Sequence, residues 1–528
     1  MNQTQQKEYS RKAAQYQQLA LPITQNIEIA EDEPVFVANA QLEELDYRKL
    51  YKAYSPKGRK SAAEPRIMFK LLVYGYMCGI YSTRKLEQAC RKNIDFIWLL
   101  QGERVPDHTS FARFRSGKAK DAIEDLFYQF VRRLWEEEEI EYEEVFIDGT
   151  KMESMANRYT FVWRKSVTRQ LAKVKEKARE LFYQYGGEGN LTVGKLQALA
   201  KSLVPEGGEM VHGTGRRKPF WQRQYEEIDR LVVRWKKYER QLFEMGCHRN
   251  SLSKTDKDAT FMRMKEDHMG NGQLKPAYNV QLAVNSEYIT GVAAFSNCTD
   301  SGTLIPFLNH IQRMQGRSYR DIVADAGYES VGNYLYLASR GQNCYIKPTN
   351  YQTRKTRKYC EQLWRAENMR YLEDEDCFVC AAGRKLRFYR SCSQESNGVV
   401  TTYNYYQCDQ CTGCPVRKQC TKSQNPDFRK EVKICEEFAQ HRAQAHENLL
   451  TERGVLLRMN RSIQVEGAFG VLKSDRQFKR FLMRGKTNIS LELFLLCLAF
   501  DLDKYCSKLR QDRRKTHLFP LKKEWLIA

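Results

Sequence analysis

The chain has 528 residues, 42% of them hydrophobic, so it can bury a large core and is too long for one ordinary domain. Lysine and arginine number 87 against 65 aspartates and glutamates, a formal charge of +22 at pH 7, which makes nucleic acid the first candidate partner and a membrane an unexpected one. The start of the chain has no signal-like apolar stretch and there are 16 cysteines, so we expect a reducing, cytoplasmic compartment.

Residues 1–60 are polar with scattered apolar positions and predict an arm or linker. Over residues 61–139 the pattern becomes helical, with an apolar run up to Cys78, a break at Gly79 and a new start at Ser82. Two short helices across a tight turn are typical of a helical DNA-binding domain.

The end of this domain contains a basic helix. Asp107 is the expected N-cap, and Arg113 and Arg115 in the helix that follows are candidate DNA contacts. The alternative is a helix face that is simply solvated.

Residues 160–265 are strongly charged and predict a helical insertion. Apolar residues recur on one stripe of its second half, which favours a helical hairpin; they are Ile228, Leu231, Val232, Trp235 and Leu242.

Strands bracket this insertion. Residues 278–285 alternate apolar and polar side chains, and short apolar runs precede Asp148 and Asp325. The order strand, strand, strand, helix, strand, helix, strand predicts an α/β core with a mixed sheet over residues 140–350 and 436–510. A basic tail is expected over residues 511–528.

Two aspartates are candidate metal ligands because each directly follows a predicted strand. Asp148 follows Val145–Ile147 and Asp325 follows Ile322–Ala324, and α/β proteins place their sites at the carboxyl ends of strands.

A third carboxylate, Glu466, borders the apolar stripe of a predicted helix, and Lys473 lies on the same face two turns later. Gly467 and Gly470 each cost roughly 1 kcal/mol in a helix relative to alanine, so close approach of a metal or phosphate is a reason for them. Three acids suit Mg²⁺ or Mn²⁺, and two such cations can stabilise the attacking and leaving oxygens of a phosphodiester.

Residues 351–435 predict a cysteine-rich insertion. Two C-x2-C pairs separated by a loop are typical of a structural zinc site, a C-x2-C-x2-C run followed by proline also resembles an iron–sulfur motif, and a metal-free segment remains open. The candidate ligands are Cys377, Cys380, Cys408, Cys411, Cys414 and Cys420.

Four segments, in this order, resemble those of bacterial insertion-sequence transposases with a DDE, ribonuclease-H-like core: FIDGTKMESMANRY, KPAYNVQLAVN, VADAGYES and VEGAFGVLK. The helical stretch before them is similar to the N-terminal domain of that group. The resemblance implies that Asp148, Asp325 and Glu466 are the catalytic, metal-binding triad. It also implies that Lys473 is the basic residue after the glutamate, and that cleavage at transposon ends is followed by strand transfer.

The partners that the resemblance implies are double-stranded DNA, as terminal inverted repeats and target, and further copies of the chain in a synaptic complex at the bacterial nucleoid. The chain departs from the family where related transposases place Tyr and Arg before the glutamate, because Met459 and Ser462 stand there, beside Arg458 and Arg461. Arg461 is nevertheless a candidate DNA contact. The alternatives are a catalytically inactive DNA-binding descendant and a related metal-dependent nuclease.

Overall fold

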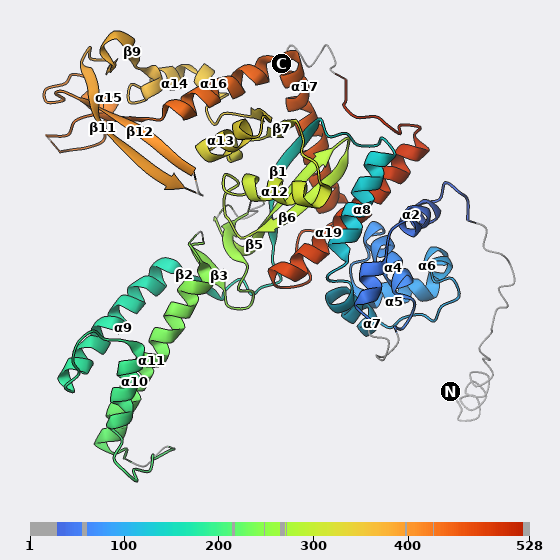
Figure 1. The fold of residues 1–528 in the computed structure, drawn as a ribbon, viewed down its shortest axis with the longest axis horizontal. Coiled ribbons are helices and arrows are strands. Elements are labelled where there is room, and N and C mark those ends of the chain that lie inside the picture. Colours follow the sequence, from blue (N-terminus) through green and yellow to red (C-terminus); the bar gives the residue numbers. More distant parts are fainter. Residues whose placement is uncertain are drawn as a thin grey trace, which may run out of the picture.

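The structure is a computed structural model that describes residues 29–54, 61–213, 217–247, 249–264, 270, 272–396, 399–425 and 427–520. The first part of the expected N-terminal arm and the end of the basic tail lie outside these ranges. Figure 1 shows a central sheet with helices around it, a helical arm and a second, smaller sheet extending to one side, and the N-terminal helices on the other. In the described ranges no helix is long and apolar enough to cross a membrane.

The N-terminal region is helical, as expected, but it begins earlier than the sequence predicts. Val35 and Leu42 are buried in the same core as the later helices, so the expected arm is wrong from residue 34 onward. Acidic residues flank these short helices in the sequence, so their few apolar residues do not form a recognisable helical pattern. Asp107 is confirmed as an N-cap, since its Oδ1 accepts a hydrogen bond from Ser110 N at 2.6 Å. The helices are α2 (Pro34–Glu43), α3 (Arg48–Lys52), α4 (Pro65–Met77), α5 (Thr83–Lys92), α6 (Ile94–Leu99), α7 (His108–Arg113) and α8 (Ile123–Glu136).

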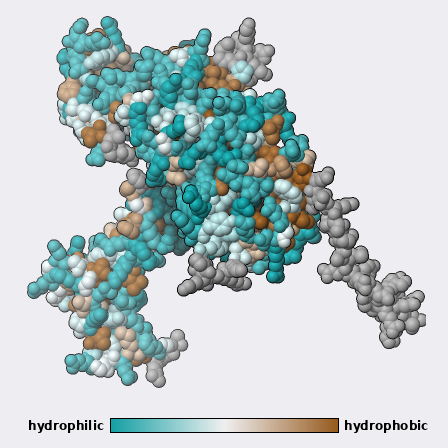
Figure 2. Space-filling view, turned by 45° about the vertical axis from the view of Figure 1, so that its right-hand side comes forward, coloured by the Kyte–Doolittle hydropathy of each residue, from teal (hydrophilic) through white to brown (hydrophobic). Residues whose placement is uncertain are grey.

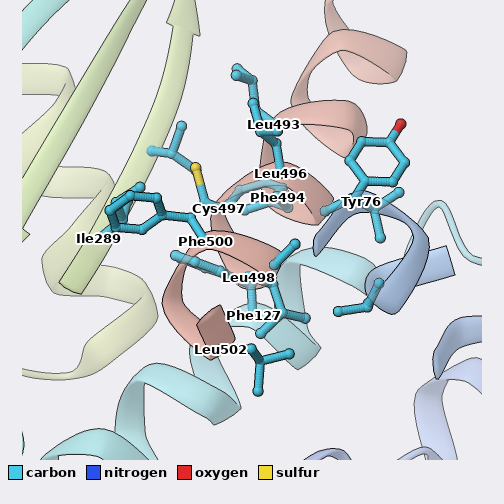
Figure 3. Close-up of a cluster of buried hydrophobic side chains, with 14 of the residues drawn as sticks. Tyr76, Phe127, Ile289, Leu493, Phe494, Leu496, Cys497, Leu498, Phe500 and Leu502 are labelled. Atoms are coloured by element: carbon cyan, nitrogen blue, oxygen red, sulfur yellow. The ribbon is translucent and has the colours of Figure 1, made fainter. Parts of the chain in front are cut away.

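The C-terminal helix α19 (Lys486–Arg510) joins the N-terminal helices to the sheet. It is apolar on nearly every side over its middle turns and is buried there, as expected of a helix surrounded by protein. Figure 3 shows side chains from α4, α8 and β6 gathered around it, with Phe127 and Ile289 among them. The helical domain and the sheet therefore share one core.

The central sheet is mixed. Its strand order is β4–β5–β1–β7–β8, and β6 pairs with β5 as well. Strands β4, β5, β6 and β1 are joined by antiparallel ladders, whereas β7 and β8 run parallel to β1. The strands are β1 (Glu144–Glu153), β4 (Thr260–Arg263), β5 (Leu274–Asn285), β6 (Tyr288–Phe295), β7 (Asp321–Ala324) and β8 (Asn343–Ile346).

Both faces of this sheet are covered, because successive side chains of a strand point to opposite faces. Val145 and Ile147 of β1 pack in one cluster with α12 (Leu304–Gln315) and α13 (Val331–Ser339). Phe146, between them, belongs to the other cluster, together with α19 and the helix that carries Glu466. That helix therefore lies on the Phe146 face of the sheet.

The helical insertion forms a separate arm between β1 and β4. Its helices pack around their own apolar core, which includes Val174, Ile228 and Trp235, and the arm projects away from the sheet (Figure 1). Its elements are β2 (Phe161–Trp163), α9 (Arg164–Gln184), α10 (Val193–Ser202), α11 (Phe220–Met245) and β3 (Ser251–Ser253); the described residues among 161–253 are called the helical arm below.

The cysteine-rich insertion is built on a second sheet, with the order β13–β12–β11–β10–β9 and antiparallel pairing throughout. The chain then returns to the central sheet through α16 (Glu436–Leu450), which packs on β8 and α13. The elements of the insertion are α14 (Arg357–Cys360), β9 (Arg370–Leu372), β10 (Cys377–Val379), β11 (Lys385–Ser396), β12 (Val399–Cys408), α15 (Arg417–Cys420) and β13 (Glu431–Ile434).

Candidate active site

Asp148 and Asp325 lie level with each other on neighbouring parallel strands. Ile147 pairs with Ala324 in the ladder between β1 and β7, and the next residue on each strand is an aspartate. The sequence predicted that Asp148 directly follows its strand, but the strand continues beyond it. Asp148 lies in the middle of β1, because the antiparallel pairing of β1 with β5 continues to Glu153.

Asp325 ends β7 and caps the short turn that follows. Its Oδ1 accepts a hydrogen bond from Gly327 N at 2.8 Å. A β-carbon on Gly327 would lie 3.0 Å from this oxygen and 3.2 Å from Oδ2 of Asp300. Asp300 is thus a further carboxylate close to the Asp325 turn.

A buried polar network fixes Asp300 on the face of β1 opposite to Asp148. Oδ1 of Asp300 accepts hydrogen bonds from Asn279 Nδ2 at 2.7 Å and Gln281 Nε2 at 3.0 Å. Gln281 pairs with Gly149 across β1 and β5, and a β-carbon at Gly149 would lie 2.6 Å from Asp300 Oδ1. Gly149 is therefore needed for close packing against this network.

Tyr328 connects the network to the Asp325 turn by donating a hydrogen bond to Gln281. Its side chain is fully buried. Burial, followed by the nearby charges of Asp300, Asp148 and Asp325, raises the pKa of Tyr328 well above its ordinary value, so its hydroxyl remains a donor at neutral pH.

The helix that carries Glu466 is not a plain α-helix. Two π-helical segments interrupt it, one of them ending at Glu466, and π turns close with i to i+5 hydrogen bonds. The consecutive segments are α17 (Glu452–Arg461), η6 (Ser462–Glu466), α18 (Gly467–Gly470) and η7 (Val471–Asp475).

Arg461 connects two of the three acids. Its Nη1 lies 3.3 Å from Asp148 Oδ2, and its Nη2 lies 3.2 Å from Glu466 Oε1. Ser462 Oγ donates a second hydrogen bond to Glu466 Oε1, at 3.2 Å. Glu466 is thereby held facing Asp148 even though its side chain is 55% exposed.

The π turn gives a physical reason for the shifted arginine. Related transposases carry their arginine four residues before the glutamate, where this chain has Ser462, and Arg461 is five residues before Glu466. Because a π turn places residues i and i+5 on one face, the guanidinium still reaches the glutamate.

Lys473 contacts the same strand as Asp148. Its Nζ donates to Thr150 Oγ1 at 2.5 Å and to the Lys151 carbonyl at 3.3 Å. Thr150 lies two residues after Asp148, so the two side chains share a face of β1, and a cationic group is held beside the acids.

The two glycines after Glu466 leave free space. A β-carbon at Gly467 or at Gly470 would meet nothing within 4 Å, so packing inside the described chain does not require either glycine. Both positions face open space on the helix that carries Glu466.

The chemistry of the donors fits a hard divalent cation, because all three acids offer only oxygen ligands. In the part of the chain that the structure describes, no three His, Cys, Asp or Glu side chains are grouped so that they could hold a metal ion. The guanidinium of Arg461 provides the positive charge between Asp148 and Glu466. A cation that contacted both carboxylates would take the place of this guanidinium.

The two candidate DNA contacts of the N-terminal domain differ in accessibility. Arg113 is exposed, whereas Arg115 is only 9% exposed and donates hydrogen bonds to Tyr76 Oη at 3.3 Å and to the Tyr81 carbonyl at 3.2 Å. Arg115 therefore belongs to the interior of the domain, and the expectation that it contacts DNA does not agree with its position.

The candidate zinc ligands are divided between one end of the second sheet and its interior. Cys380 lies in the turn between β10 and β11, and Cys408 ends β12 opposite Leu386. Burial, with the Cys411 and Cys380 thiols nearby, raises the pKa of Cys408 to about 12. Lys430 N donates a hydrogen bond to Cys411 Sγ at 3.2 Å.

The remaining cysteines of the motif differ in their positions. The pKa of Cys420 is raised by burial, and the thiols of Cys411, Cys380 and Cys414 lie near enough to affect it. Cys377 is buried within β10, where it pairs with residues of β9 and β11, so it is separate from this group.

Comparison with known protein families gives two matches. Residues 379–506 match the family described as "Transposase DDE domain", and residues 25–117 match the one described as "Transposase domain (DUF772)". The first match includes Glu466, and Asp148 and Asp325 lie outside both. No curated protein and no solved structure matches the chain.

Both matched domains are transposase domains, so the protein is of the transposase class, whose members are enzymes that act on DNA. Within that class, the two matches support an insertion-sequence DDE transposase.

Two features of this site were missed in the sequence. The Asp300 network depends on the register of β5 against β1, which residue spacing does not contain. Arg461 was predicted to contact DNA, and the structure places it between two acids. The sequence signal for this was that Arg461 lies one residue before the usual arginine position, Ser462.

Proposed function

We propose that this transposase cleaves DNA at the ends of its element and joins the freed 3′ ends to target DNA, with Asp148, Asp325 and Glu466 as catalytic acids. One observation carries the proposal: Asp148 is level with Asp325 on the neighbouring strand and shares the guanidinium of Arg461 with Glu466. Three acids that are far apart in the sequence thus lie on two neighbouring strands and on a helix whose Arg461 contacts the first strand.

The same proposal assigns the central sheet to the ribonuclease-H-like class. The antiparallel strands β6, β5 and β1, followed by the parallel strands β7 and β8, support this assignment. The helical arm and the second sheet are then insertions into that core.

The three acids would hold Mg²⁺ or Mn²⁺. When bound, such cations activate a water or hydroxyl nucleophile and stabilise the charge on the leaving oxygen. Arg461 compensates the charges of Asp148 and Glu466 in the free protein and becomes available to a DNA phosphate when a cation replaces it. Lys473, held beside Asp148 by Thr150, provides a second phosphate contact.

The proposed substrates are the terminal inverted repeats of the element and a target duplex. Arg113, on the surface of the N-terminal domain, is retained as a DNA contact, whereas Arg115 is not. Two ends must be brought together for strand transfer, so we expect the chain to work as a homo-oligomer on the bacterial nucleoid.

We further propose that the second sheet binds structural zinc. Cys380, Cys408 and Cys411 would provide three thiolates, and Cys414 or Cys420 the fourth. The backbone hydrogen bond from Lys430 to Cys411 Sγ supports this, because such outer contacts stabilise thiolate ligands.

The test is incubation of purified protein with a labelled duplex that carries one element end, in Mg²⁺ and in EDTA, with target DNA present. We expect metal-dependent nicking and a strand-joined product. Nicked DNA without joined product would indicate the related nuclease, and DNA binding without either product would indicate an inactive descendant.

A further inference from the structure

Helix α11 of the helical arm has an excess of unpaired positive charge. It contains six basic residues, and within the described chain none of them forms an ion pair. All six are exposed, and five of them lie along the side of the helix away from the arm core. We call these five the α11 ridge: Arg223, Arg230, Arg234, Lys237 and Arg240.

The acids of α11 do not neutralise the ridge, because lysines from outside the helix engage them. Lys177 lies 2.6 Å from Glu227, and Lys175 lies 3.0 Å from Glu239. The other two pairs of this kind are Lys218 with Glu226 and Lys257 with Glu244. Four of the five acids of α11 are therefore satisfied, and the ridge keeps its charge.

The arm is firmly attached close to the proposed active site. Asp256, just after the arm, is 3% exposed and accepts hydrogen bonds from Ser154 Oγ at 2.6 Å, Tyr278 Oη at 2.9 Å and Gly485 N at 3.3 Å. Ser154 directly follows β1, the strand that carries Asp148. From Asp148 to the end of β1 is about 17 Å at the usual rise of a strand.

We infer that the α11 ridge binds the phosphate backbone of duplex DNA that extends from the active site. The inference rests on the proposed function for the identity of the DNA, and it adds a contact surface outside the catalytic core. The ridge runs for about 26 Å along α11. That length corresponds to roughly seven base pairs at 3.4 Å each.

Duplex DNA fits this surface better than a single strand does. Proteins that bind single strands provide aromatic side chains on which bases stack. Between Arg223 and Arg240 the aromatic side chains pack into or against the arm core; they are Tyr225, Trp235 and Tyr238. Arginine and lysine side chains on one side of a rigid helix suit phosphates, which carry no sequence information. The ridge would thus add affinity and position the duplex.

The experiment measures binding of the full-length protein to labelled duplexes of 10 and 40 base pairs carrying one element end, by fluorescence anisotropy in Ca²⁺ over a range of salt concentrations. The ridge variant combines Arg230→Gln, Arg234→Gln and Lys237→Gln. The matched control combines Lys175→Gln, Lys177→Gln and Lys218→Gln, which removes the same charge from the same arm at ion-paired positions.

We expect the ridge variant to lose about ten-fold or more in affinity for the long duplex. Its slope of log affinity against log salt should fall by about 2.7, since each lost phosphate contact is worth roughly 0.9. Binding of the short duplex and the matched control should change less than two-fold. Circular dichroism checks that both variants fold.

Two outcomes would overturn the inference: unchanged affinity of the ridge variant for the long duplex, and an equal loss in the matched control. A ridge variant that keeps its DNA affinity but sediments as a smaller oligomer would assign the ridge to a protein interface. The proposed function is tested separately by cleavage of the short duplex, which the ridge variant should retain. Absence of cleavage by the wild type would contradict the proposed function and not the role of the ridge.

Discussion

The guanidinium of Arg461 lies 3.3 Å from the carboxylate of Asp148, a residue 313 positions earlier in the chain. The same guanidinium contacts Glu466 across a π turn. Asp148 and Glu466 thus share one cationic group. A variant that lacks this group tests whether a divalent cation binds to the two carboxylates in its place.

The first prediction concerns Arg461→Gln. Without divalent cations, the variant should lose about 1 kcal/mol of stability, as expected for a partly exposed ion pair, because two nearby carboxylates lose the guanidinium that they share. Added Mg²⁺ should then stabilise the variant more than the wild type, because the cation no longer competes with the guanidinium. Thermal unfolding with and without Mg²⁺ measures both effects.

A suitable control for this prediction is Arg458→Gln. Arg458 donates to Tyr351 Oη at 2.7 Å and forms no ion pair with the three acids in the described structure. If Mg²⁺ stabilised Arg461→Gln, Arg458→Gln and the wild type equally, the competition between Arg461 and a cation would be refuted.

The second prediction concerns Glu466→Gln, which keeps the size of the side chain and removes one negative charge. Cleavage and strand transfer should fall by several orders of magnitude while binding of element ends persists. Asp148→Asn and Asp325→Asn should behave alike. Since the three acids act as one unit, a double variant should be scarcely worse than a single one.

Near-normal strand transfer by Glu466→Gln in Mg²⁺ would contradict this assignment. Asp300 would then be the next acid to test, because it lies beside the Asp325 turn. Glu153 is less suitable, since its side chain is 9% exposed and its carboxylate is engaged by Arg158 at 2.6 Å.

Local patterns of apolar and polar residues predicted several strands of the central sheet. The apolar runs before Asp148 and Asp325 predicted the strands, and alternation predicted β5. The π turn at Glu466 depends on a hydrogen-bond shift that leaves no pattern of residue types. Burial of Arg115 depends on Tyr76 and Tyr81 from a distant helix and loop, so one arginine of a segment that looks solvated in the sequence lies inside the domain.

The third prediction concerns the second sheet. Metal analysis of purified protein should find about one zinc per chain, and Cys408→Ser and Cys411→Ser should each lose it, with lower thermal stability. Because the pKa of the metal-free Cys408 thiol is raised to about 12, zinc must displace a proton. Its affinity should therefore increase with pH.

Cys392→Ser provides the control for zinc, because Cys392 pairs with Tyr403 farther along the β11–β12 ladder. It should keep both zinc and stability. Metal-free protein whose stability is unaffected by Cys408→Ser and Cys411→Ser would contradict the zinc proposal.

The last prediction concerns Glu492, which lies buried in α19 and accepts hydrogen bonds from Leu482 N at 3.1 Å and Met483 N at 3.2 Å. Burial raises its pKa from 4.5 to about 7, although the nearby charge of Arg115 opposes the shift. The folded state therefore holds this proton more tightly than the unfolded state does. Its stabilising effect is fully present below about pH 4.5 and is lost as the pH rises to about 7.

Glu492→Gln should remove this dependence, since an amide does not titrate. The free energy of unfolding, measured by urea titration at pH 5 and at pH 8, should therefore fall less in the variant than in the wild type. Arg115→Gln should have the opposite effect and steepen the loss, because it removes the charge that holds the pKa of Glu492 down. Equal pH dependence in the wild type and Glu492→Gln would show that the carboxylate is already ionised at pH 5, and that Arg115 compensates it more fully than its burial suggests.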